Sequence, residues 1–385
     1  MQRIILFDGP NWETMHPLTL TRPLAACRVG GLTIKEKWES LGYTCACLTQ
    51  AYLQPRFPIQ HIEANLYING GALPSSKFIE SIKQLKPGHA LTSQTGQIVA
   101  ARTPGPIHHN GWSDEIKGYP SERVEVQILE YPEDILNHAI GQMRKDYTTY
   151  QSNRGPSAAP DPSVRCRGDE IYIHPSAKLY DCILNATEGP IYIGPEVEIM
   201  ENAVIRGPVW IEEKCTIHVG AKVYGGTMLG PYSKIGGEIK RTTIFGYSNK
   251  AHDGYLGDSV LGMWCNLGAD TNNSNMKNTQ GNVSLWDATR QSYRVTDRQF
   301  LGLIMGDHTM SAINISFMTG SVVGVFSNIF GGTHDRWTRS FSWGDSSTAY
   351  DVEKALTVAR RVLSRRSIAL DNSYELMLRH IAGHR

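Results

Sequence analysis

The sequence lacks the features that would place the chain in a membrane or on a nucleic acid. No apolar run approaches the roughly 20 residues that a membrane-spanning helix needs. The 38 Lys and Arg residues nearly balance the 37 Asp and Glu residues. Such a chain has neither the basic surface of a nucleic-acid-binding protein nor a polybasic membrane patch. The opening MQRIILFDGP is a short apolar run that meets a turn, which predicts a first strand and not a signal peptide.

Cysteine is also scarce for a chain of this length. Seven cysteines, an odd number, are scattered along 385 residues, which is typical of reduced thiols in the cytoplasm. The spacing of Cys45 and Cys47 fits neither a zinc knuckle nor a redox motif. The sequence therefore predicts a cytoplasmic protein of two or three domains, with no nucleic-acid partner and no membrane partner.

Residues 1–150 alternate between strand-like and helix-like segments, which predicts an α/β domain with ligands beyond the strand ends. The expected strands are residues 4–7, 45–48 and 65–68. Two apolar helix faces are expected, formed by Ile34, Trp38 and Leu41 and by Phe78, Ile79, Ile82 and Leu85. Residues 151–168 are rich in Ser, Pro and Gly and are predicted to form a linker.

Residues 169–334 contain a repeat with a period of six. Branched aliphatic residues recur at this spacing without a break at Ile193, Ile199, Ile205, Ile211, Ile217, Val223, Leu229 and Ile235. Neither a helix nor a simple alternating strand has this period, whereas a β-solenoid of hexapeptide repeats does, with the aliphatic residue inside the coil. The ladder resumes at Leu256, Leu261 and Leu267, and again at Phe317, Val323 and Ile329.

Residues 335–385 are predicted to form a helical arm. The segment 351–366 has an apolar face, and four arginines gather toward its end, at Arg360, Arg361, Arg365 and Arg366. Such a cluster suits a solvated face at the negative end of a helix. The alternative is a contact with a phosphorylated ligand.

The stretch 250–258, KAHDGYLGD, followed by NLGA at 266–269, resembles a known family. It is similar to the acetyltransferase half of the bifunctional glucosamine-1-phosphate acetyltransferase/N-acetylglucosamine-1-phosphate uridyltransferases. The whole chain resembles a divergent bacterial branch of that family, whose first strand ends in Phe-Asp before a PLTxTRP segment, here residues 17–23. The resemblance implies a sugar nucleotidyltransferase-like α/β domain followed by a left-handed parallel β-helix and C-terminal helices.

The resemblance also implies a catalytic base, His252, and a site for the sugar phosphate. Acetyl transfer from a thioester to a sugar amine needs a base for the amine proton and donors for the tetrahedral oxyanion. A histidine is mostly neutral at cytoplasmic pH and suits the first role, although a lone loop histidine is ordinarily a surface group. Lys222 and Lys240 match the family's phosphate-binding cations, and Tyr255 and Asn266 match its sugar-binding residues. Each lysine also fits a solvent-facing position, and Asn266 also fits an asparagine ladder.

The acetyl-CoA groove is implied by four further positions. Ala269 matches the family's small residue at the thioester, and Asn275 matches the asparagine of an Asn-Tyr-Asp-Gly turn. Ile313 stands where the family has serine and Gly331 where it has alanine, so these two positions depart from the pattern. Residues 281–300 predict an extra hairpin, which either covers this groove or is a plain surface hairpin.

The nucleotide-binding half departs further from the family. The glycine-rich triphosphate loop is reduced to Asp8-Gly9-Pro10, and Pro10 lacks a backbone donor. Arg22 is a candidate phosphate cation or a structural arginine. Asn69 stands where the family has a metal-binding aspartate, and Asp8 is a candidate Mg²⁺ ligand or a turn-opening residue.

The leading prediction is a homotrimeric enzyme that uses acetyl-CoA to acetylate glucosamine-1-phosphate. Uridylyl transfer from UTP, with Mg²⁺, is a second activity that the motifs leave open. One alternative is an acyltransferase for another amino sugar with a degenerate nucleotide-sugar-binding domain. The other is a non-catalytic nucleotide-sugar-binding oligomer, and the set His252, Tyr255 and Asn266 argues against it.

Overall fold

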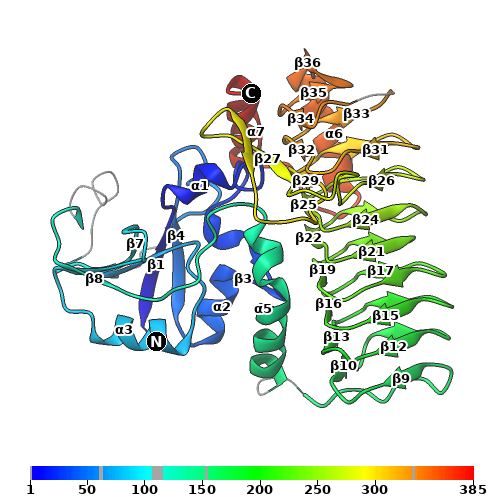
Figure 1. Cartoon of the computed structure of the whole chain (residues 1–385), viewed down its shortest axis with the longest axis horizontal. Helices are drawn as coiled ribbons and strands as arrows, with labels where there is room; N and C mark the ends of the chain where they lie inside the picture. Colours follow the sequence, from blue (N-terminus) through cyan, green and yellow to red (C-terminus); the bar gives the residue numbers. More distant parts are fainter. Residues whose placement is uncertain (1, 60–63, 106–115, 152–154, 332–333) are drawn as a thin grey trace. The chain divides into compact units, whose positions relative to one another are not determined.

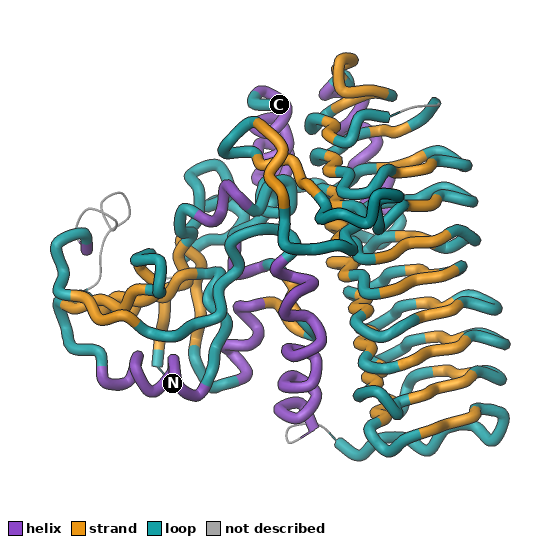
Figure 2. Tube along the Cα trace, in the orientation of Figure 1, coloured by secondary structure: helices purple, strands orange, loops and turns teal. Residues whose placement is uncertain are grey.

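The computed structural model describes residues 2–59, 64–105, 116–151, 155–331 and 334–385 (Figure 1). The chain divides into two compact units. The first contains Met1–Met15, Thr21–Cys27 and Leu32–Tyr131, and the second contains His16–Leu20, Arg28–Gly31 and Pro132–Arg385. Figure 2 shows that the first unit mixes helices with strands, whereas most of the second consists of short strands between turns.

The first unit is built on a six-stranded mixed sheet in the order β4-β1-β5-β7-β6-β8. β1 is parallel to β4 and β5, and β7 is antiparallel to β5 and β6. The strands are β1 (Arg3–Phe7), β4 (Thr44–Leu48), β5 (Leu66–Asn69), β6 (His89–Thr92), β7 (Ile98–Arg102) and β8 (Ser121–Arg123). The three predicted strands are confirmed within one residue at each end.

Two of the helices described in this unit, α2 and α3, begin at side-chain caps, whereas α1 follows Pro10 and has none. They are α1 (Asn11–Thr14), α2 (Ile34–Ser40) and α3 (Ser76–Gln84), with a 3₁₀ turn at Leu24–Ala26 and the two-residue strand β3 (Leu32–Thr33) before α2. The Thr33 hydroxyl accepts from the Glu36 backbone N–H, and the Glu36 carboxylate accepts from that of Thr33, which forms a capping box. Ile34 and Trp38 are buried as predicted, but Leu41 is 45% exposed because α2 ends before it.

The second unit is a parallel β-solenoid with three faces, each named here after one of its strands. The β25 face contains β10 (Ile171–Ile173), β13 (Ile191–Ile193), β16 (Val209–Ile211), β19 (Thr227–Leu229), β22 (Thr243–Gly246), β25 (Val260–Met263), β29 (Ile304–Met305), β32 (Val322–Val323) and β34 (Trp337–Thr338). The β23 face contains β11 (Lys178–Leu179), β14 (Glu198–Ile199), β17 (Thr216–Ile217), β20 (Lys234–Ile235) and β23 (Asn249–Lys250). The β24 face contains β9 (Arg165–Arg167), β12 (Ile183–Asn185), β15 (Val204–Arg206), β18 (Lys222–Val223), β21 (Glu238–Lys240) and β24 (Tyr255–Gly257).

Further strands extend this arrangement toward the C-terminus. Single bridges link Asn249 to Asn266 and Asn266 to Met310, so β30 (Met310–Ser311), β33 (Asn328–Ile329), β35 (Ser342–Trp343) and the antiparallel β36 (Asp345–Ala349) continue the β23 face. β26 (Asn272–Asn273) and β31 (Ser316–Phe317) pair with each other. The solenoid strands thus begin within the predicted linker, at β9, and run past residue 334.

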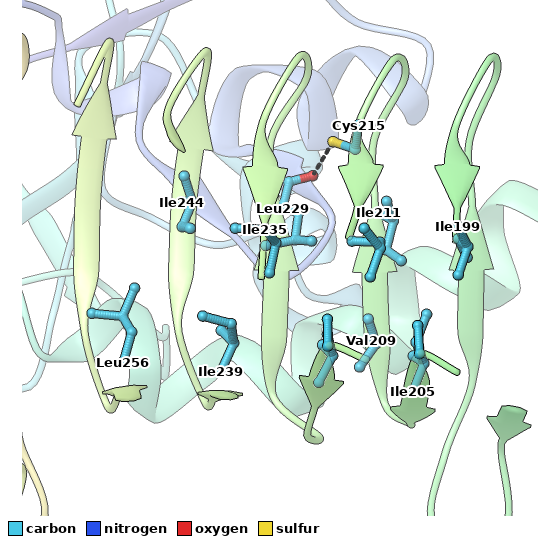
Figure 3. Close-up of a cluster of buried hydrophobic side chains, with 14 of the residues drawn as sticks. Ile199, Ile205, Val209, Ile211, Cys215, Leu229, Ile235, Ile239, Ile244 and Leu256 are labelled. Carbon is cyan, nitrogen blue, oxygen red and sulfur yellow. Dashed lines mark hydrogen bonds between the residues drawn. The ribbon is translucent and has the colours of Figure 1, made fainter. Parts of the chain in front are cut away.

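The interior of the solenoid is the predicted aliphatic ladder. All eight residues of the unbroken series are at most 1% exposed, and they belong to one buried cluster. Figure 3 shows part of this cluster, with Ile199, Ile205 and Ile211 among the labelled side chains. Because strands of successive coils pair in parallel, like residues stack directly on one another, as in Ile199 on Ile217. This stacking confirms the solenoid that the six-residue period predicts.

The ladder also continues through the region where the sequence pattern is interrupted. Ile239, Ile244 and Lys250 pair in register with interior residues of the preceding coil. Val223 pairs with Ile239, sixteen residues on, whereas Ile205 pairs with Val223, eighteen residues on. The coils are shorter here, so the six-residue period is lost although the core is unbroken.

One corner of the solenoid carries a stack of aromatic rings. Its residues have left-handed φ angles of 51° to 64°, and they are Tyr232, Tyr247, Trp264, His308, Phe326 and Phe341. Bulky residues rarely adopt this conformation. Adjacent rings lie 4.3 to 6.1 Å apart between centroids, and this stacking offsets part of the conformational cost.

The C-terminal helices α6 (Val352–Ser364) and α7 (Asn372–Gly383) pack on this corner. The Tyr374 hydroxyl lies 2.7 Å from Nε2 of His308, and the Arg366 guanidinium lies 5.3 Å from the centre of the Tyr232 ring. Arg360 is also engaged, in an ion pair with Glu375. These contacts give two of the four clustered arginines a structural role.

The helix α5 (Asp134–Gln151) belongs to the compact unit of the solenoid, although residues 1–150 were expected to form one domain. The Asp146 carboxylate accepts from the Gly31 backbone N–H, beside the two-residue strand β2 (Arg28–Val29). The predicted hairpin is confirmed as β27 (Ser284–Asp287) antiparallel to β28 (Ser292–Val295). Its Arg294 forms an ion pair with Glu133 next to α5. Within the described ranges, none of the helices has the length and apolar character to span a membrane.

Candidate functional site

The register of the solenoid places four of the predicted residues at equivalent positions in successive coils. Asn249, Asn266, Met310 and Asn328 form one continuous line of backbone bridges. His252, Ala269, Ile313 and Gly331 each lie three residues after one of these positions. The predicted catalytic base and three of the predicted acetyl-CoA residues therefore occupy one corner, which we call the histidine corner.

The histidine corner is open to solvent. His252 and Gly331 are exposed, and the Ile313 side chain is 63% exposed despite its apolar character. His252 lies in the turn between β23 and β24. His218 lies near it, and its pKa is lowered by burial and by the positive charges of Lys234 and His252. The corner thus combines small and apolar side chains with an exposed imidazole.

The predicted phosphate and sugar residues share the neighbouring β24 face. Lys222, Glu238 and Tyr255 are register partners in three successive coils, and Val223, Ile239 and Leu256 beside them point inward. Lys240 is two residues from Glu238 on the same strand and therefore faces the same side. Both lysines are exposed. The structure thus brings Lys222, Lys240 and Tyr255 onto one surface next to the histidine corner.

Tyr255 is held in place by a polar network that the sequence did not predict. Its hydroxyl accepts from Asn275 Nδ2 at 3.0 Å, and the same amide donates to Asp258 at 2.7 Å. The ring lies over Gly257, where a Cβ would come within 2.2 Å of the Tyr255 hydroxyl. Burial raises the pKa of Tyr255 to about 12. The phenol therefore keeps its proton and can donate it to a ligand while it accepts from Asn275.

Asp258 is the centre of this network. It is fully buried and forms ion pairs with Arg241 at 2.8 Å and with Arg298 at 3.3 Å. Arg298 comes from the segment after the extra hairpin and also donates to Asn137 on α5. The hairpin segment is thus tied to the motif that carries Tyr255. Asp258 ends the Tyr-Leu-Gly-Asp motif, a signal that could have identified it, whereas nothing local in the sequence points to Arg298.

Asn266 does not join the other sugar-binding candidates. It lies on the β23 face, and its Oδ1 accepts from Asn249 Nδ2 at 3.3 Å. This is the asparagine ladder that the sequence left open as an alternative. Asn266 and Tyr255 are separated by the histidine corner, so Asn266 is not a neighbour of Tyr255 on the same face.

The first unit carries the candidate nucleotide-binding residues at the ends of two paired strands. Phe7 and Asn69 are register partners, so Asp8 and Asn69 lie at the same edge of the sheet. The Asp8 carboxylate accepts from the Leu24 backbone N–H at 2.8 Å and from the Thr49 hydroxyl. Burial raises the pKa of Asp8 to about 7, and these two hydrogen bonds oppose the rise.

Asn69 belongs to a cluster of side-chain amides that lies against Gly9. The Asn69 Oδ1 accepts from the Gly71 backbone N–H, and its Nδ2 donates to Asn11 Oδ1. Gln97 also donates to Asn11, at 2.9 Å. A Cβ at Gly9 would come within 2.3 Å of Asn69 Nδ2, so a larger residue there would displace these amides. The sequence missed Asn11 and Gln97, because their side chains meet only after the sheet forms.

These residues do not fit a divalent cation. Asp8 is a buried acid whose two oxygens already accept hydrogen bonds from the protein, and Asn69 is neutral and fully buried. Within the described part of the chain, no group of three or more His, Cys, Asp or Glu side chains is placed to hold a metal. Arg22 is also buried, and its carbonyl accepts from the Trp12 indole.

The fold thus consists of an α/β sheet unit and a parallel β-solenoid with a histidine corner. Comparisons with known proteins show which class of protein the first unit resembles. A family model described as "Sugar nucleotidyl transferase" matches residues 4–155. A bifunctional sugar-1-phosphate nucleotidylyltransferase/acetyltransferase of Sulfurisphaera tokodaii is 29% identical over 247 residues, 54% of this chain and 61% of that protein. The bifunctional protein GlmU of Methanocaldococcus jannaschii is 31% identical over 147 residues, 33% of this chain and 35% of that protein.

A GlmU of Methanococcus maripaludis is 36% identical over 89 residues, 23% of this chain and 20% of that protein. The chain thus spans between about a fifth and three fifths of the length of these curated relatives. The resemblance predicted from the motifs is confirmed: over part of its length the chain is similar to bifunctional sugar-1-phosphate nucleotidylyltransferase/acetyltransferases.

The buried Asp8 predicts a pH-dependent stability. Its pKa rises from an ordinary value of 3.8 to about 7 on folding. The protonated Asp8 therefore contributes its full share to the stability of the folded protein below pH 3.8, and this contribution is lost as the pH rises through about 7. Asp8→Asn stays neutral at every pH. We expect this variant to match the wild type at pH 4 and to melt at a higher temperature than the wild type at pH 8.

Thermal melts followed by circular dichroism between pH 4 and pH 8 measure this difference. The exposed Glu122→Gln in the same unit is the matched control, and its melting curve should follow that of the wild type. If the melting temperatures of Asp8→Asn and the wild type changed with pH in parallel, folding would not raise the pKa of Asp8.

Proposed function

We propose that the solenoid transfers an acetyl group from acetyl-CoA to the amine of an amino-sugar 1-phosphate, with glucosamine-1-phosphate as the expected substrate. The observation that carries the proposal is the single corner shared by His252, Ala269, Ile313 and Gly331, next to a face with two exposed lysines. The similarity to a bifunctional sugar-1-phosphate nucleotidylyltransferase/acetyltransferase supports the same reaction class.

The chain's own groups supply the chemistry of this transfer. His252, exposed at the corner, accepts the proton that the sugar amine loses as its nitrogen attacks the thioester carbonyl. Backbone N–H groups of the turn are the available donors for the oxyanion. Lys222 and Lys240 attract the sugar phosphate, and the protonated Tyr255 donates to a sugar oxygen. The thiolate of coenzyme A leaves with the acetyl carbonyl restored.

The acyl donor extends along the histidine corner. Ala269 leaves room for the thioester, and Ile313 and Gly331 give an apolar, open strip for the arm of acetyl-CoA. Asn275 is engaged with Tyr255 and Asp258, so it acts on the sugar side of the site as well as beside the donor.

The first unit is proposed to bind a nucleotide sugar without turnover. The observation that favours this assignment is the amide cluster of Asn11, Asn69 and Gln97 at the strand ends, where Mg²⁺-dependent transfer needs carboxylates. Uridylyl transfer from UTP, giving UDP-N-acetylglucosamine, is the competing assignment.

The protein is further proposed to be a cytoplasmic homotrimer. Three flat faces on a triangular coil favour closed threefold packing. Val219, Ile313 and Met318 are apolar side chains that are 58% to 63% exposed on the solenoid, and a neighbouring chain would cover them. Each acetyl site would then be completed by a second copy.

Replacing His252 tests the catalytic base. We expect His252→Ala to lower kcat for acetyl transfer to glucosamine-1-phosphate by roughly 10²- to 10⁴-fold, the usual contribution of general base catalysis. Thiol release from acetyl-CoA measures the rate. His174→Ala, a second loop histidine of the solenoid, should keep wild-type activity. A His252→Ala rate within a few-fold of the wild type would remove His252 from the mechanism.

Replacing Lys240 tests the phosphate site. We expect Lys240→Ala to raise the KM for glucosamine-1-phosphate by about 10-fold or more, because the lysine binds the phosphate in the ground state and in the transition state. The KM for acetyl-CoA should stay unchanged. Lys178→Ala, an exposed lysine on the β23 face, is the control. If only the KM for acetyl-CoA changed, Lys240 would belong to the part of the site that binds the acyl donor.

Pyrophosphate release tests the first unit. With UTP, N-acetylglucosamine-1-phosphate and Mg²⁺, we expect release at less than about a hundredth of the acetyl transfer rate, since the carboxylates that hold the metal are missing. Isothermal titration with UDP-N-acetylglucosamine should still detect binding to the first unit. Rapid pyrophosphate release would instead establish uridylyl transfer.

A further inference from the structure

A lysine occupies an interior position of the solenoid directly beneath the catalytic turn. Lys250 is the register partner of the ladder residue Ile235, and the next coil places Leu267 at the same position. Lys250 is 0% exposed and is among the largest fully buried side chains of the protein. An aliphatic side chain is expected here, so the lysine needs a reason other than core packing.

The Lys250 ammonium binds the turn that carries His252. Its Nζ donates to the carbonyl oxygen of His252 at 2.6 Å and to that of Asp253 at 2.9 Å. Gly254 closes the turn with a left-handed φ of +119°, and a Cβ there would lie 3.2 Å from Nζ and 2.3 Å from the carbonyl oxygen of Thr271. The amine therefore fits into a space that the turn leaves for it.

The buried cation is costly for the fold. Burial lowers the pKa of Lys250 to about 8, and the carboxylates of Asp253 and Asp270 oppose this shift. Burying a charge costs free energy that an aliphatic ladder residue would avoid. A ladder with Met or Leu at this position would pack without that cost, so the contribution of Lys250 lies in what its amine binds.

We propose that Lys250 is a positioning residue that fixes residues 251–254 from inside the solenoid, so that the His252 imidazole is held toward the acyl acceptor. Two hydrogen bonds to consecutive carbonyl oxygens restrain the backbone that directly follows the Cα of His252. The consequence for catalysis rests on the proposed acetyl transfer. The restraint on the turn does not depend on the reaction.

The test replaces the amine while keeping an apolar ladder. Lys250→Met removes both hydrogen bonds and retains an unbranched side chain. Leu267→Met places the same residue at the same ladder position one coil on, and Lys234→Met removes an exposed lysine from the adjacent coil.

We expect Lys250→Met to lower kcat for acetyl transfer by about 10- to 100-fold, the effect of a misplaced catalytic group, with both KM values within about threefold. Both controls should keep the wild-type kcat.

Hydrogen exchange measured by mass spectrometry gives a second readout that needs no activity. We expect peptides covering 249–256 to exchange faster in Lys250→Met than in either control, while peptides from the rest of the solenoid are unchanged. The melting temperature should stay within a few degrees of the wild type or rise, since the buried charge is gone.

The outcomes separate the two proposals. If His252→Ala is fully active, the proposed function fails, and faster exchange at 249–256 in Lys250→Met still supports the restraint on the turn. Wild-type exchange at 249–256 in Lys250→Met would overturn the positioning role whatever the activity. If neither Lys250→Met nor Lys250→Leu folds, Lys250 is a core residue and the proposal is also overturned.

Discussion

The parallel register between successive coils is the constraint on which the solenoid and its site depend. Each interior residue stacks on its counterpart in the coil before, as Ile217 does on Ile199. Because the backbone is fixed by these pairs, the corner residues between strands are fixed as well. His252 and Ile313 are 61 residues apart in the chain, yet the register places them at equivalent corner positions. An apolar core with no chemistry of its own thus aligns the polar groups outside it.

The buried charges mark where the solenoid departs from this simple core. Asp258 is buried but is satisfied by two arginines and Asn275, so it orders the surroundings of Tyr255. Lys250 is buried and binds two carbonyl oxygens of the neighbouring turn. Buried charges are stable only when they are paired or hydrogen-bonded. Both of these lie within a few residues of His252, the proposed base, where they restrain the surrounding backbone and side chains.

The first unit uses its strand ends in a different way. Its sheet has the strand pairing that an α/β site needs, with β1 between β4 and β5. The space beyond these strands, however, is filled by hydrogen-bonded amides and by an acid that burial keeps from ionising readily. The first unit therefore keeps this strand framework, while its strand ends carry neutral amides and one buried acid.

The sequence by itself determined the elements whose signal is local and periodic. The six-residue spacing of aliphatic residues identified the solenoid, since only interior positions repeat in that way, and the motif around His252 and Tyr255 identified the candidate site. Tertiary structure alone decided where short coils continue the ladder and that α5 joins the solenoid unit. It also decided that Arg298 meets Asp258 from forty residues away and that Asn266 lies on the β23 face, not on the β24 face that carries Tyr255. These contacts join segments distant in the chain, and no local pattern records which side chains meet once the register is set.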